Sequence, residues 1–71
     1  MLTTIKYFVG RRRVQSKTGT FPSLGAALRA GRRGLQDIRI AWGMTGFRGP
    51  IRCAVTYGRT IVPMESRKLL G

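Results

Sequence analysis

The sequence predicts a small α+β domain in which one helix packs on a mainly antiparallel sheet, in the order β-α-β-β-β. Apolar and polar residues alternate over 3–9 and 51–57, as they do in half-buried strands. A helical pattern of apolar residues follows Ser23. With 71 residues the chain has room for one domain with a thin core. We place this domain at residues 1–64 and expect a basic C-terminal tail at 65–71.

The first strand is expected over 3–9, and Gly10 ends it. The polar, basic segment 11–20 that follows has two readings. It is either a loop or the return of a hairpin, with a short second strand over 12–16.

The helix is expected to begin after Ser23, whose hydroxyl can accept a hydrogen bond from a free backbone N–H of the first turn. Leu24, Ala27 and Leu28 then share one face. Gly34 is expected to end the helix, because glycine is the residue most often found just past a helix C-terminus.

Three further strands are expected after the helix. Residues 37–43 alternate in polarity, a glycine-rich loop follows, and 51–57 and 60–64 form a hairpin. Pro63 lacks a backbone N–H and therefore indicates an edge strand.

The turn of this last hairpin sets its register. A two-residue turn at Gly58–Arg59 would pair Val55 with Val62, and a turn at Tyr57–Gly58 would shift the pairing but keep the face. The residues expected in the core are Ile5, Tyr7, Val9, Leu24, Ala27, Leu28, Leu35, Ile38, Ile40, Trp42, Ile51, Cys53, Val55 and Val62.

The charge is extreme for a folded domain. Fourteen Lys and Arg residues stand against two acids, so the net charge is +12, and eleven of the fourteen are arginine. Such a surface repels itself unless a polyanion screens it. Nucleic acid, either DNA or RNA, is therefore the first expected partner.

The chain lacks the residue types that acid–base catalysis and metal binding need. The chain has no His, one Cys and two acids, so we expect no enzyme activity, no metal site and no cofactor. Cys53 is expected to be a small core residue, and a single cysteine fits the reducing cytoplasm. No stretch of about 18 apolar residues is present to span a membrane.

The arginines fall into groups that would contact phosphates. Arg11, Arg12 and Arg13 follow the first strand, and a second group lies on the polar side of the helix without acids at helical spacing to balance it. Guanidinium groups bind phosphates through two parallel hydrogen bonds, although a GC-rich genome also raises the arginine content. The candidate nucleic-acid-binding residues are Arg11, Arg12, Arg13, Arg29, Arg32, Arg33, Arg39, Arg52 and Arg59.

One sheet face offers a second kind of contact. Lys6, Arg39 and Arg52 are expected to project from the face opposite the core, together with Phe8. This face would bind a backbone and stack a base on Phe8. Alternatively, Phe8 is a partly covered hydrophobic residue without a binding role, or a second copy of the chain covers the face in a homodimer. Phe47 in the glycine-rich loop would either insert into a groove or fold back on the core.

The main hypothesis is a small basic protein that contacts phosphates with little sequence specificity, since no known DNA-reading motif is present. The alternative is a small inhibitor encoded by a phage or mobile element, which would bind an acidic protein surface or a ribonucleoprotein. The β-α-β-β-β order is similar in outline to that of some anti-CRISPR proteins, which occupy nucleic-acid surfaces of a host complex. This resemblance is one of topology and carries over no residue.

Overall fold

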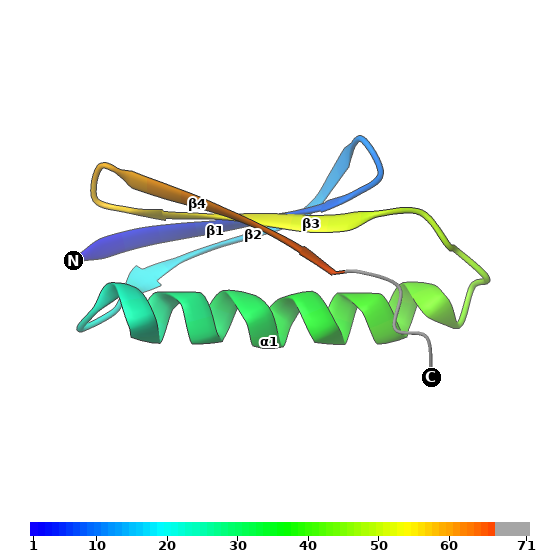
Figure 1. Ribbon diagram of the computed structural model, residues 1–71, viewed down its shortest axis with the longest axis horizontal. Coiled ribbons are helices and arrows are strands. Elements are labelled where there is room, and N and C mark those ends of the chain that lie inside the picture. The colour runs from blue at the N-terminus through cyan, green and yellow to red at the C-terminus, as the bar shows by residue number, and fades with distance from the viewer. Residues whose placement is uncertain (67–71) are drawn as a thin grey trace.

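The computed structural model describes residues 1–66 and has two layers, a four-stranded antiparallel sheet and one helix that crosses one of its faces (Figure 1). The predicted class, one helix packed on an antiparallel sheet, is confirmed. The sheet order is β2-β1-β3-β4. The elements in chain order are β1 (Leu2–Val9), β2 (Arg12–Thr20), α1 (Leu24–Gly43), β3 (Ile51–Tyr57) and β4 (Thr60–Ser66).

Both hairpins turn on a Gly-Arg pair. Gly10 has a φ of 62° and Gly58 a φ of 61°, a left-handed conformation that glycine adopts without steric cost. The Gly58–Arg59 turn pairs Val55 with Val62, which confirms that predicted register. The Gly10–Arg11 turn leads directly into β2, so segment 11–20 is the hairpin return, and its strand is longer than the predicted 12–16.

The helix begins as predicted but continues past its predicted end. The Ser23 hydroxyl accepts a hydrogen bond from the Ala26 backbone N–H at 3.2 Å. Gly34 is buried in the middle of α1 and does not end it. The strand predicted over 37–43 is wrong, because this segment is helical. The order of elements is therefore β-β-α-β-β.

The face that the helix buries explains this correction. Leu35 and Ile38 continue the apolar face of the first helical turns and are buried, whereas Ile40 is 66% exposed. Ile38 and Trp42 fit both a strand period and a helix period, so only Ile40 distinguishes the two patterns. In the helix, Ile38 is buried and Trp42 is half-buried, and Leu35 before this segment joins them on the same face.

The core lies between α1 and the sheet. Cys53 is 1% exposed within it, as predicted, and burial raises the pKa of its thiol to about 11. Of the other predicted core residues, Leu24, Leu28, Trp42 and Val62 are half-buried and Ile40 is exposed. The buried apolar residues are Ile5, Tyr7, Val9, Ala27, Leu35, Ile38, Ile51, Cys53 and Val55.

Two buried glycines let α1 lie close to the sheet. A Cβ on Gly34 would overlap the hydroxyl of Tyr7 and lie 2.6 Å from its Cζ, and a Cβ on Gly31 would lie 2.8 Å from Val55 Cγ2. The helix packs on β3, β4 and β1 and, within residues 1–66, does not reach β2. The edge strand β2 is therefore separated from α1 by a cleft.

The other edge strand is β4, and it contains Pro63 as predicted. This strand extends to Ser66, so Glu65 and Ser66 are paired with β3 and do not belong to a tail. The remainder of the predicted tail, 67–71, lies outside the described residues.

Candidate nucleic-acid interface

The first arginine group gathers at one end of the sheet. Arg11 lies at the β1–β2 turn, and Arg12 and Arg13 begin β2; all three are exposed. Arg12 pairs with Val9 and therefore shares the helix side of the sheet, whereas Arg13 pairs with Phe8 on the open side. The turn thus presents guanidinium groups in more than one direction.

The loop 44–50 lies beside this turn and adds to it. The Gly10 backbone N–H donates to the Pro50 carbonyl at 3.0 Å, and the Arg52 guanidinium donates to the Gly10 carbonyl at 3.3 Å. Phe47 in this loop packs against the core, with its ring 5.9 Å from that of Trp42, so the groove-inserting reading of Phe47 is not supported. We call this region the basic end: Arg11, Arg12, Arg13, Arg48 and Arg52.

The second arginine group lies on α1 as predicted, with Arg29, Arg32 and Arg33 all exposed. Arg39 does not join them on a binding surface. Its Nε donates to the Ser66 hydroxyl at 3.2 Å and its Nη2 to the Ser66 carbonyl at 3.0 Å. The prediction that Arg39 projects from a sheet face is wrong, because its segment is helical and its guanidinium ties α1 to β4.

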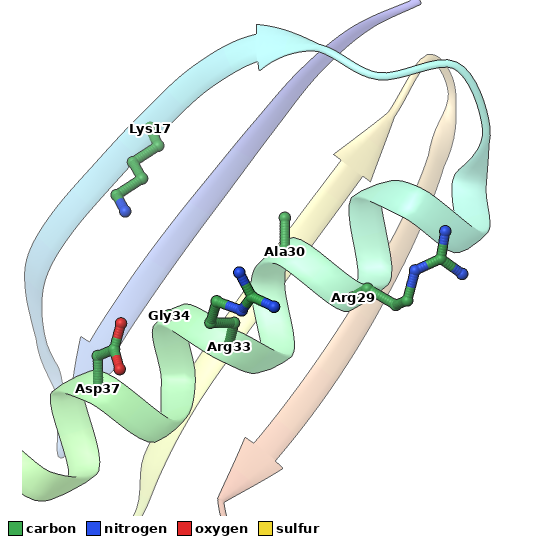
Figure 2. Close-up of a pocket in the computed structure, with 6 residues that line it drawn as sticks. All are labelled: Lys17, Arg29, Ala30, Arg33, Gly34 and Asp37. Carbon is green, nitrogen blue, oxygen red and sulfur yellow. The ribbon is translucent and has the colours of Figure 1, made fainter.

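The cleft between β2 and α1 brings cations from two elements together. Figure 2 shows Lys17 extending from β2 toward the helix, with Arg33 and Asp37 directed back toward it from α1. Ala30 and Gly34 are small, so the wall between these side chains is recessed. The hollow has a volume of about 390 Å³ and is lined by Lys17, Arg29, Ala30, Arg33, Gly34 and Asp37.

A more apolar hollow of about 280 Å³ continues this cleft and shares Lys17 and Ala30 with it. Ile5, Tyr7 and Phe21 contribute to its lining. The pKa of Tyr7 is raised, first by burial and then by the nearby Cys53 and Asp37. The Tyr7 phenol is therefore protonated at neutral pH and remains a potential hydrogen-bond donor. We call the two hollows together the β2–α1 cleft.

Lys17 is the member of this site that the sequence-based prediction missed. Its signal lies in the hairpin register, because Lys17 pairs with the buried Ile5 and so projects toward the helix side. Three cations around one cleft make it electropositive, and Asp37 offsets part of that charge.

The sheet face that α1 does not cover, here called the open face, carries a mixture of basic, small and apolar residues. Lys6 and Arg52 lie on this face as predicted, and Arg13 joins them. Ile61 is 65% exposed there. By strand pairing the face comprises Leu2, Thr4, Lys6, Phe8, Arg13, Ser16, Thr18, Thr20, Arg52, Ala54, Thr56, Ile61, Pro63 and Glu65, and Leu2 is 67% exposed.

Arg59 lies apart from the other candidates. It is exposed at the β3–β4 turn, at the end of the sheet opposite the basic end. Among residues 1–66, no three His, Cys, Asp or Glu side chains form a group that could hold a metal ion. No helix in the same part of the chain is long and apolar enough to cross a membrane.

Comparison with protein-family models, curated proteins and solved structures finds no match for this chain.

Proposed function

We propose that this protein binds nucleic acid through its phosphate backbone, using arginine clusters and little sequence specificity. The observation that carries this proposal is the placement of exposed cations from separate elements around one concave site, the β2–α1 cleft. The basic end and the exposed arginines of α1 extend the positive surface on either side. Only two acids in the whole chain oppose it.

The residue types suit phosphates. Guanidinium groups bind a phosphate through two oxygens at once, and a Lys ammonium contributes a point charge. The fold supports the proposal of low specificity, since helices that read the major groove are often held on the backbone by a second helix or arm. In residues 1–66, α1 is the single helix, and it packs on the sheet.

The salt dependence of binding tests the proposal. Contacts with roughly 5–7 phosphates would make log K fall against log[salt] with a slope near −5 to −6. We expect fluorescence anisotropy with labelled oligonucleotides of unrelated sequence to give similar slopes and affinities. A flat salt response, or binding to one sequence alone, would contradict the proposal.

A matched pair of variants locates the surface. Arg33→Gln and Arg59→Gln each remove one positive charge from an exposed arginine, but only Arg33 lines the β2–α1 cleft. We expect Arg33→Gln to reduce the salt slope by about 0.9 and Arg59→Gln to reduce it less. Equal effects would indicate that net charge, and not the cleft, determines binding.

The alternative function is an inhibitor that binds an acidic protein surface. Its topological likeness to some anti-CRISPR proteins depended on the order β-α-β-β-β, which the structure does not have. The high positive charge remains as its support. Salt-dependent binding to purified oligonucleotides favours the nucleic-acid function; no such binding, with a purified acidic protein bound instead, would favour the inhibitor.

A further inference from the structure

Phe8 is the aromatic side chain that does not serve the core. Among residues 1–66, Tyr7 is buried in the core, and the remaining aromatic residues pack against it: Phe21, Trp42, Phe47 and Tyr57. On β1, Phe8 lies between the buried core residues Tyr7 and Val9. Its side chain therefore projects to the opposite side of the sheet, the open face, where it is half-buried. Its ring therefore needs a different explanation from the others.

The strand register places an arginine residue on each side of Phe8, next to a register shift in the β1–β2 pairing. Phe8 pairs with Arg13 on β2 and with Arg52 on β3. Directly paired residues have their Cβ atoms about 4.5–5.5 Å apart. Arg52 is anchored by its hydrogen bond to the Gly10 carbonyl at 3.3 Å, so part of this arrangement exists before any ligand binds.

The residues next to Phe8 on the open face suit a polar, negatively charged polymer as ligand. Lys6 lies one row away, where it pairs with Ser16 and Ala54. Glu65, at the far edge beside Arg52, is the acid on this face. Lys6, Arg13 and Arg52 make this part of the face positively charged and would repel a second, equally charged copy of the chain, which favours a polyanion as the occupant.

We propose that the open face binds single-stranded nucleic acid, with one base stacked on Phe8 and the flanking phosphates held by Arg13 and Arg52. This inference rests on the proposed function and specifies the form of nucleic acid. A base inside a duplex is already stacked on its neighbours, so only an unpaired base can lie flat on a side-chain ring. Stacking on aromatic residues combined with a basic surface is the usual design for binding single strands.

Phe8→Leu tests the stacking contact while it keeps an apolar side chain at this position. We expect its affinity for oligo-dT to fall on the order of 5- to 100-fold and its affinity for a duplex of the same length to change less than about 2-fold. Tyr57→Leu is the matched control, because Tyr57 packs against the core, pairs with the buried Thr3 and lines neither the β2–α1 cleft nor the open face. Thermal unfolding of both variants establishes that they are folded.

A spectroscopic test reports on the contact directly. In a Trp42→Phe background, Phe8→Trp leaves one indole on the open face. We expect oligo-dT to quench its fluorescence at a concentration that matches the binding curve, and duplex DNA to leave it unchanged. Absence of quenching while oligo-dT binds would overturn the inference.

The outcomes separate this inference from the proposed function. One outcome is that Phe8→Leu weakens single-strand and duplex binding equally, and another is that it leaves both unchanged. If the salt slope persists in either case, the open-face site is wrong and the proposed phosphate binding stands. If the wild-type protein binds no oligonucleotide, both proposals fail. If Phe8→Leu instead converts a dimer into a monomer in sedimentation, a second copy covers the open face and the inference is overturned.

Discussion

Gly34→Ala ought to destabilise this protein, although alanine is the better helix former. In a solvent-exposed helix interior the same replacement gains about 0.8–1.0 kcal/mol. At Gly34 the new methyl group would overlap the Tyr7 hydroxyl and lie 2.6 Å from Cζ and 3.1 Å from Cε1. Tyr7 is 1% exposed, so its ring has little room to move aside.

The two opposing effects set the expected magnitude. Inserting a methyl group into a packed interior costs about 1–3 kcal/mol, which exceeds the gain in helix propensity. The net loss is then up to about 2 kcal/mol, or roughly 4–8 °C in Tm for each kcal/mol in a domain of this size. Gly43→Ala is the matched control in the same helix, since a Cβ there meets no atom within 4 Å. We expect this control to be neutral or stabilising by about 0.5 kcal/mol.

Urea unfolding followed by circular dichroism measures both variants. A second replacement, Tyr7→Phe, removes the oxygen that the new methyl group overlaps and should recover part of the loss in the Gly34→Ala background. If Gly34→Ala is as stable as Gly43→Ala, then α1 does not cross Tyr7 as closely as described. In that case Gly34 would be better explained as the helix end that its sequence position suggests.

Two further predictions concern the core and the helix anchor. The Cys53 thiol has a pKa of about 11 in the folded protein, against 9.0 in the unfolded chain, so the unfolded chain loses this proton first as pH rises. The free energy of unfolding should therefore fall between about pH 9 and about pH 11, at up to about 1.4 kcal/mol per pH unit. Cys53→Ala should flatten this fall in urea unfolding series, and an unchanged profile would refute the assignment. Arg39→Gln should cost about 1 kcal/mol of stability through its lost bonds to Ser66 and leave oligonucleotide affinity within about 2-fold of the wild type; a larger loss of affinity would return Arg39 to the binding surface.

The fold class was predictable because several local signals agree. The alternation in β1 and β3 and the cap at Ser23 each determine a local conformation, and the Gly58–Arg59 turn determines a register. The end of the helix was not predictable in the same way. Glycine propensity indicated a stop at Gly34, but the helix gains more from burying Leu35 and Ile38 than it loses at one glycine.

The candidate site, like the fold, could be predicted from the sequence only in part. The exposure of Arg11, Arg29 and Arg33 follows from their sequence context. In contrast, Lys17 comes to line the same cleft as the helix arginines only because of where β2 lies relative to α1. Nothing local to Lys17 shows that the helix leaves β2 uncovered. Gly31 supplies a reason, since its close approach to Val55 on β3 and Met64 on β4 holds the helix over those strands and leaves a cleft along the other edge.

The same helix placement separates two basic surfaces, the β2–α1 cleft and the open face. The β2–α1 cleft is concave, partly neutralised by Asp37, and formed by long cations above small residues. The open face carries its arginines beside an aromatic ring and has Glu65 at its edge. Both surfaces carry cations that suit phosphates. The aromatic side chains that line the cleft, Tyr7 and Phe21, belong to the core or pack against it, whereas Phe8 on the open face does not. A preference for single strands that depends on Phe8, together with a salt slope that depends on Arg33, would show that the two surfaces contribute separately to one binding free energy.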